Sequence, residues 1–256
     1  MLNECLPSYY SSLSPFREVF ARGNPIVTYH KLGPQPARVR LKGLYLSAKL
    51  FAAQLGELQA AGFVSGSLSH SARPFKQAEI VITFDDGYVN VLRLALEPLA
   101  ATKFTAIQFL PANLLGQRNE WDVALREAPE AIMDAAQVRE WLAAGHDIGS
   151  HTLTHPFLTR LPADQAREEI SASKKRLEDL FGRPVEHFCY PYGDWNPAVR
   201  DVVIEAGYRT ACTMEFGVND AGTSPFALKR LMARYRSRNW KGMKAWLAER
   251  WTALAR

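Results

Sequence analysis

Apolar and polar residues divide the chain into two alternating kinds of segment. Short runs of apolar, often β-branched or aromatic, residues predict strands, whereas apolar residues spaced three or four positions apart predict helices. The predicted strands cover residues 25–30, 80–84, 104–109, 147–150, 185–190, 208–213 and 226–231. The predicted helices cover residues 47–61, 89–101, 134–144, 162–181, 196–207 and 237–255.

Capping residues mark where several of these helices begin. Ser47 and Asn196 are side chains that accept hydrogen bonds from a first helical turn, and Pro197 suits the first helical position. Asp134 and Gln137 have the spacing of a capping box. The starts of three predicted helices therefore rest on hydrogen-bonding chemistry as well as on periodicity.

Strands that alternate with helices predict parallel βα units, and therefore an α/β barrel or an open α/β sheet. Residues 1–24 contain Ser, Pro and Tyr with little periodicity, and we expect an irregular N-terminal arm there. Residues 25–256 contain no internal repeat and no linker. We expect them to form a single domain, because 256 residues are enough for one large domain with a full core.

Composition indicates a globular protein without a membrane span. Hydrophobic residues make up 47% and charged residues 22% of the chain, and no apolar run approaches the roughly 20 residues that cross a bilayer. The N-terminus lacks the basic and apolar regions of a secretory signal. The three cysteines, Cys5, Cys189 and Cys212, are too scattered for a disulfide framework. These features predict a reduced, cytoplasmic protein.

Positive charge is concentrated at the C-terminal end of the chain. Residues 229–256 contain nine Lys or Arg and one acidic residue, a net charge of +8 within a total of +5. This distribution favours an anionic surface or substrate near the tail over general nucleic-acid binding. The predicted helix 237–255 has an apolar stripe that includes Trp240, Leu247 and Trp251. This helix either packs on the domain or makes a peripheral membrane contact.

Two carboxylates stand directly after the apolar run 80–84. Asp85 and Asp86 repel each other, and burial of either is costly without a partner. Because parallel strands place chemistry at their C-terminal ends, this pair indicates a bound cation. The alternative is an Asp-Gly turn, Asp86-Gly87, whose acids cap the next helix.

Two histidines follow another predicted strand. His151 and His155 are four residues apart, which would place both imidazoles on one side of a helical turn, close enough to share a metal ion. One carboxylate with two imidazoles leaves coordination positions open for water and substrate, as in catalytic metal sites. The ion is expected to be zinc, although iron, cobalt or nickel also suits these ligands.

Three motifs together resemble the polysaccharide deacetylases, also called the NodB-homology family or carbohydrate esterase family 4. The motifs are Thr83-Phe-Asp-Asp-Gly87, His151-Thr-Leu-Thr-His155 and Phe188-Cys-Tyr-Pro-Tyr-Gly193. The resemblance implies a distorted (β/α)₇ barrel and a metal-dependent hydrolase that removes acetyl groups from N-acetylated glycans. It also implies metal ligation by Asp86, His151 and His155, a general base at Asp85, and an oxyanion donor in the backbone N–H of Tyr192.

The sequence departs from the family pattern at two positions. The late histidine that often protonates the leaving amine is absent, and His30 at the end of the first predicted strand is the best candidate for general acid. A Tyr-His at that place resembles the poly-N-acetylglucosamine deacetylase branch. The motif arginine that orients the catalytic Asp is replaced by Cys189, and Arg230 could supply its charge from the last predicted strand. His70, His146 and His187 are interpreted as structural.

Three other functions remain open. Similar proteins cleave other non-peptide C–N amide bonds. Two histidines and a carboxylate are also the ligand set of non-haem iron oxygenases, although Asp85 and the third motif argue against that reaction. A non-catalytic carbohydrate-binding protein is the third alternative, and retention of two costly carboxylates, Asp85 and Asp86, disfavours it.

Overall fold

The computed structural model describes residues 9–10, 12–37, 39, 41–74, 78–125 and 128–233. Their centre is a closed barrel of parallel strands, arranged around the barrel in chain order. These strands are β2 (Ile26–Tyr29), β6 (Glu79–Phe84), β7 (Ala106–Leu110), β8 (Asp147–Ser150), β9 (His187–Cys189), β10 (Thr210–Phe216) and β11 (Leu228–Ala233). β11 pairs with β2 and closes the barrel, with Leu231 opposite Val27. The expected (β/α)₇ barrel is confirmed.

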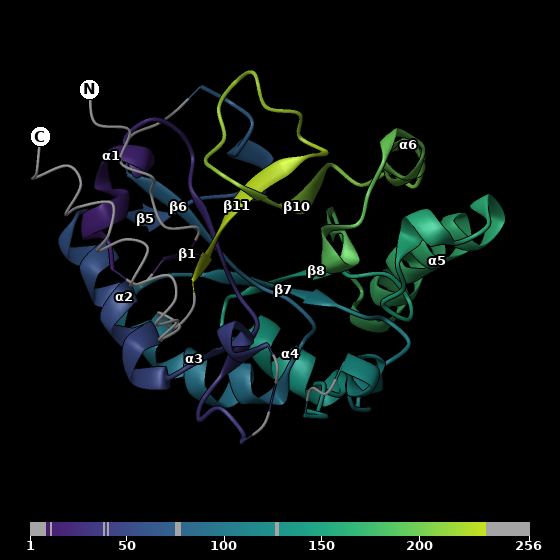
Figure 1. The fold of residues 1–256 in the computed structure, drawn as a ribbon, viewed down its shortest axis with the longest axis horizontal. Coiled ribbons are helices and arrows are strands. Elements are labelled where there is room, and N and C mark those ends of the chain that lie inside the picture. Colours follow the sequence, from purple (N-terminus) through teal and green to yellow (C-terminus); the bar gives the residue numbers. More distant parts are fainter. Residues whose placement is uncertain are drawn as a thin grey trace, which may run out of the picture.

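Helices cover the outside of this barrel (Figure 1). They are α2 (Ala48–Ala60), α3 (Val89–Thr102), α4 (Ala135–Ala143), α5 (Ala163–Phe181) and α6 (Pro197–Glu205). The predicted caps are confirmed. The Ser47 side chain accepts from Leu50 N, Asn196 accepts from Val199 N, and Asp134 forms the capping box at α4.

Shorter elements connect the barrel units. The two-residue strands β3 (Lys31–Leu32) and β4 (Tyr45–Leu46) pair with each other, and β5 (Val64–Ser65) pairs with β6. The 3-10 turns are η1 (Ser14–Phe16), η2 (Lys42–Leu44), η3 (Leu68–His70), η4 (Glu120–Leu125), η5 (Leu158–Arg160) and η6 (Pro191–Gly193). Because η4 and η6 follow the C-terminal ends of β7 and β9, both lie on the side of the barrel where the predicted site residues gather.

Two apolar clusters stabilise the two faces of the sheet. The smaller cluster fills the barrel interior and includes Ile26, Val81, Phe109 and Leu228. The larger one lies between the sheet and the helices and includes the fully buried Trp141. Because both faces of a barrel strand are covered, residues 80–84 of β6 are all buried and form a nearly continuous apolar run in the sequence.

The expectation of an irregular arm is wrong for the described part of residues 1–24. β1 (Tyr9–Tyr10) pairs in parallel with β11, and α1 (Arg17–Phe20) follows η1. Tyr10, Phe16 and Phe20 are buried, with ring centroids of Tyr10 and Phe16 5.4 Å apart. These three aromatic residues follow no single helical or strand period, so periodicity along the chain did not predict the elements that bury them.

The described helices include none that is both long and apolar enough to cross a membrane. The predicted helix 237–255, with its apolar stripe and basic residues, lies outside the described residues.

Candidate active site

Asp85 and Asp86 follow β6 directly, and the backbone turns sharply between their side chains. The Asp85 N–H still donates to the Tyr29 carbonyl at 3.0 Å, so Asp85 continues the ladder between β2 and β6. Asp86 and Gly87 both have a φ of 70°, which costs a non-glycine residue about 1 kcal/mol or more. A Cβ on Gly87 would lie 2.7 Å from Leu110 Cδ2. This turn lets two adjacent buried carboxylates reach different partners.

Asp86 lies beside the two histidines that follow β8. Its Oδ1 is 3.4 Å from His151 Nε2 and 3.3 Å from His155 Nε2, and all three side chains are buried. Atoms that bind one zinc ion tetrahedrally at about 2.0–2.2 Å lie about 3.3–3.6 Å from one another. Both the donor set and its spacing therefore fit a divalent metal ion.

Hydrogen bonding and charge prepare these side chains for ligation. His151 Nδ1 lies 2.7 Å from the Cys189 carbonyl oxygen, so Nδ1–H donates to it and Nε2 is left facing Asp86. Burial alone would raise the pKa of Asp86, but the imidazoles of His151 and His155 outweigh burial and hold that pKa well below its ordinary value. The carboxylate is thus ionised, as a metal ligand must be.

The two histidines do not lie on a helical turn, and that expectation is wrong. Residues 151–155 form a loop in which Thr152 and His155 have φ of 69° and 63°. The His155 N–H donates to Thr152 Oγ1 at 2.9 Å. The Glu169 carboxylate of α5 accepts hydrogen bonds from the backbone N–H groups of residues 153 and 154, each at 2.9 Å. These side-chain acceptors replace helical hydrogen bonds and still bring both imidazoles to Asp86.

Whereas Asp86 contacts two histidines, Asp85 contacts the guanidinium of Arg230 on β11. Nη1 and Nη2 donate to Oδ1 and Oδ2, each at 2.8 Å. Nη1 also donates to Thr28 Oγ1 at 3.0 Å and Thr83 Oγ1 at 3.3 Å, and Nη2 lies 3.1 Å from Cys189 Sγ. Burial alone would raise the pKa of Asp85, but the charge and hydrogen bonds of Arg230, together with His30 and His151, lower that pKa below its ordinary value. Arg230 thus contacts the Asp85 carboxylate and lies beside Cys189, the residue that stands in place of the motif arginine.

Asp85, His151 and Cys189 also offer three ligand atoms within 4.8 Å of one another. Burial raises the pKa of the Cys189 thiol to about 11, so the thiol is protonated at neutral pH. Arg230 already occupies both oxygens of Asp85. The Asp86 group is therefore the better candidate metal site.

His30 stands at the end of β2, on the solvent side of Asp85. Its Nε2 lies 3.6 Å from Asp85 Oδ2, and 14% of its side chain is exposed against 3% for Asp85. Burial lowers the pKa of His30, and the Asp85 charge only partly opposes that effect. The imidazole is therefore neutral at neutral pH.

Aromatic rings from two loops enclose His155. Trp121 of η4 stacks on the His155 ring, with centroids 4.5 Å apart and an interplanar angle of 21°. Tyr192 of η6 meets the same ring edge-on at 4.5 Å and stacks on Phe157 at 3.9 Å. Tyr192 has a φ of 59°, a left-handed conformation that these ring contacts stabilise. The contact of Trp121 with His155 was not predicted. Its only signal in the sequence is the length of the connection over residues 111–129, which contains Trp121.

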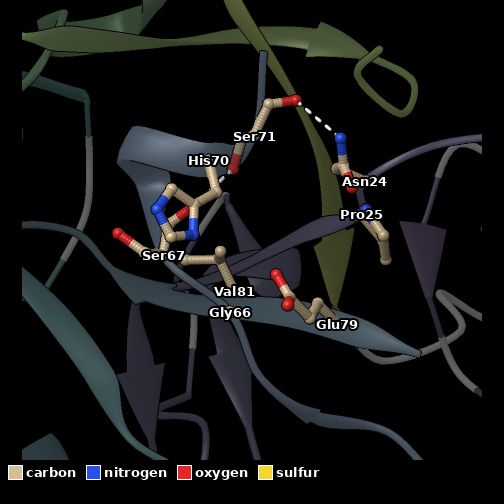
Figure 2. A pocket seen from close by; sticks show the side chains of 8 residues that line it. All are labelled: Asn24, Pro25, Gly66, Ser67, His70, Ser71, Glu79 and Val81. Atoms are coloured by element: carbon tan, nitrogen blue, oxygen red, sulfur yellow. Dashed lines mark hydrogen bonds between the residues drawn. The ribbon is translucent and has the colours of Figure 1, made fainter. Parts of the chain in front are cut away.

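The histidines interpreted as structural lie away from this site. His187 starts β9, and its Nδ1 is 2.9 Å from Thr210 Oγ1. His146 precedes β8 and packs against Trp141. Figure 2 shows His70 beside a hollow at the N-terminal ends of β2 and β6, the opposite end of the barrel. That hollow has a volume of about 10 Å³, which suffices for one water molecule and excludes a substrate.

Comparisons with known proteins found similar sequences and similar folds. The profile of the family described as "Polysaccharide deacetylase" matches residues 72–211. The chain is 41% identical over 135 residues to a chitooligosaccharide deacetylase of Azorhizobium caulinodans, which is 52% of this chain and 57% of that protein. The chain therefore spans little more than half the length of this relative.

Two solved structures share the fold. IcaB from Ammonifex degensii matches with a TM-score of 0.73 at 23% identity, over 88% of this chain and 96% of that one. The deacetylase PplD from Streptococcus pyogenes, solved in complex with acetate, matches with a TM-score of 0.72 at 20% identity, over 87% of this chain and 97% of that one. At these identities the likeness concerns the fold.

Proposed function

Because this chain belongs to the polysaccharide deacetylase family, we propose that it is a metal-dependent hydrolase that removes N-acetyl groups from the sugar residues of a glycan. The observation that carries the proposal is the group of Asp86, His151 and His155 next to the ion pair of Asp85 and Arg230. A relative with 41% identity over about half of this chain is named a chitooligosaccharide deacetylase, which supports an N-acetylated glycan as the substrate.

Asp86 Oδ1, His151 Nε2 and His155 Nε2 would hold the ion. Two imidazoles and one carboxylate suit zinc best, and iron, cobalt or nickel also bind such a set. A divalent ion held there would lower the pKa of a water molecule and polarise the amide carbonyl.

Asp85 is the proposed general base. The two hydrogen bonds from Arg230 fix both carboxylate oxygens, so Asp85 has one orientation toward the attacking water. The same guanidinium lowers the pKa of Asp85 and weakens it as a base. A weak base is sufficient, because the water to be deprotonated is itself made acidic in this site.

His30 is the proposed general acid for the leaving amine. Since its imidazole begins neutral, the proton that it donates is the one that Asp85 takes from water, transferred across the 3.6 Å between the two side chains. The backbone N–H of Tyr192 is the proposed donor to the carbonyl oxygen as negative charge develops there. Water thus adds to the carbonyl carbon, the C–N bond breaks, and acetate and a free amine leave.

The test is acetate release from a panel of N-acetylated glycans by zinc-supplemented protein. Asp85→Asn preserves the shape of the side chain and removes the base, so we expect kcat to fall about 10²- to 10⁴-fold. Zinc stoichiometry should stay unchanged, because Asp85 is not a proposed ligand. Asp164→Asn, at an exposed position of α5, is the matched control and should keep the wild-type rate.

Acetate release that survives Asp85→Asn at the full rate would exclude Asp85 as the base. Absence of release from every glycan, with zinc bound, would contradict glycan deacetylation. Small cyclic amides would then be the next substrates to assay, since a related hydrolase would open their C–N bond.

A further inference from the structure

Lys31, the residue after His30, is completely buried and has no role in the reaction described above. Its Nζ atom makes no hydrogen bond to any described residue. Lysine side chains are almost never fully buried unless they are paired, because an ammonium group loses its hydration when it leaves water. A lysine at this position therefore needs an explanation beyond packing.

Two tyrosine rings enclose the ammonium group. Nζ lies 5.0 Å from the ring centroid of Tyr45 and 4.8 Å from that of Tyr88. A cation within about 6 Å of an aromatic centroid is attracted by the negative face of the ring, most strongly where water is excluded. Both rings are buried. The two tyrosines thus replace part of the hydration that Lys31 has lost.

Two connections of the barrel meet at this ammonium group. Lys31 begins β3 and Tyr45 begins β4, and the two residues lie opposite each other in the register of these strands. Tyr88 belongs to the next connection, two residues beyond Asp86. Lys31 therefore joins the chain after the proposed general acid to the chain after a proposed metal ligand.

A third connection, between β7 and α4, is attached to the same group. The Tyr45 hydroxyl donates to Glu130 Oε1 at 3.0 Å. The Met133 N–H donates to the Gly87 carbonyl at 2.8 Å. Three connections on the side of the barrel that contains the candidate site are thus held together around Lys31.

The turn at Asp86 depends on such contacts. Asp86 and Gly87 both have a φ of 70°, and this turn places Asp86 Oδ1 beside the imidazoles of His151 and His155. A left-handed conformation in a non-glycine residue persists only where the surrounding structure maintains it. Because Gly87 has no side chain, Tyr88 is the first side chain after Asp86 that can anchor the turn.

On the basis of the proposed metal-dependent reaction, we propose that Lys31 is a positioning residue for the metal ligand Asp86. Its ammonium group fixes the ring of Tyr88, and Tyr88 in turn maintains the conformation that presents the carboxylate to the ion. The protein retains an unpaired buried charge, which lowers its stability, because that charge keeps the metal site in order.

The test replaces Lys31 by methionine, which has a similar shape and no charge. Lys31→Met should weaken zinc affinity about 10- to 100-fold, the range for residues that orient metal ligands, as measured by competition with a chelator. The Tm of the zinc-free protein should stay the same or rise by up to roughly 4 °C, because an apolar side chain suits this buried position better than an unpaired ammonium group. Lys49→Met, the same change at an exposed position of α2, should alter neither quantity.

A double variant tests whether Lys31 acts through Tyr88. Tyr88→Leu removes one of the two rings and should also weaken zinc binding. If Lys31 acts through this ring, adding Lys31→Met to Tyr88→Leu should cause no further loss of zinc affinity. Losses that add up in the double variant would overturn the proposal.

Wild-type zinc affinity in Lys31→Met would equally overturn it. A Tm of the zinc-free Lys31→Met protein well below the wild-type value would do the same, because Lys31 would then support the whole fold and not the metal site. Zinc affinity and Tm are measured without substrate. Absence of acetate release, together with weaker zinc binding in Lys31→Met, would therefore contradict glycan deacetylation and leave the positioning role supported.

Discussion

At the scale of residues, the left-handed conformation of Asp86 turns two adjacent carboxylates toward different partners. Asp86 adopts a φ of 70° and faces two imidazoles, while Asp85 stays in the sheet and faces Arg230. Sequence motifs could predict the chemical identities at this site, because the chemistry restricts which side chains serve. They could not predict that Trp121 stacks on His155, since that contact depends on the path of a long loop.

The contribution of the ion pair of Asp85 and Arg230 can be measured by removing the positive charge. Arg230→Met leaves a buried carboxylate without its partner, so we expect the free energy of unfolding to fall by about 3–5 kcal/mol. Loss of the guanidinium also raises the pKa of Asp85, because Arg230 is the largest influence that lowers it. The base is then protonated at higher pH, and the acidic limb of the rate profile should move to higher pH. Chemical denaturation and a pH–rate profile measure the two effects.

Arg230→Lys is the second variant, because it retains the positive charge and loses the two-pronged hydrogen bonding. It should move the acidic limb less than Arg230→Met and still lower kcat. An unchanged rate and an unchanged limb in a folded Arg230→Met protein would refute any positioning role for this arginine.

At the scale of elements, helices were more predictable than loops. Caps at Ser47, Asp134 and Asn196 operate through hydrogen bonds to residues three positions away, so the sequence nearby contains the signal. Residues 151–155 have the same four-residue spacing as a helical turn but form a loop. Their hydrogen-bond acceptor, Glu169, lies in the next helix, and no pattern within the loop reveals it.

Glu169 is therefore predicted to support metal binding without touching the metal. Its carboxylate accepts two backbone N–H groups and the Thr154 hydroxyl, and thereby holds the loop that carries His155. Glu169→Ala should weaken zinc affinity about 10- to 100-fold, the range for residues that orient metal ligands. Competition with a chelator measures it, and Glu168→Ala, at the exposed neighbouring position, is the control. Equal zinc affinities for the two variants would contradict this role.

At the scale of the whole molecule, the alternation of strands and helices was sufficient to predict parallel βα units. Closure of the barrel was not derivable from that alternation, because an open sheet and a barrel share the same local pattern. What distinguishes them is the pairing of β11 with β2, between residues about 200 positions apart. The resemblance to a family, carried by three motifs, supplied the prediction of closure.

Metal binding should stabilise the whole barrel, because its ligands come from the loops after β6 and β8. Zinc at about 100 times its dissociation constant would add about 2.7 kcal/mol to the free energy of unfolding. For a chain of this size that raises Tm by roughly 5–10 °C, measurable by calorimetry with and without a chelator. Asp86→Asn should abolish most of the zinc-dependent shift, and Asp201→Asn, exposed on α6, should retain it. A full shift in Asp86→Asn would place the metal elsewhere.

The distance of 145 positions along the chain from Asp85 to Arg230 has a consequence for synthesis on the ribosome. At about 5–20 residues per second, Asp85 is made roughly 7–30 s before Arg230. During that interval the nascent chain holds most of its βα units and a carboxylate whose counter-ion does not yet exist. A nascent chain that stops before β11 has neither the closing strand nor the charge that neutralises its interior. β11, the last strand that the structure describes, therefore completes the barrel and the ion pair of Asp85 and Arg230 in the same event.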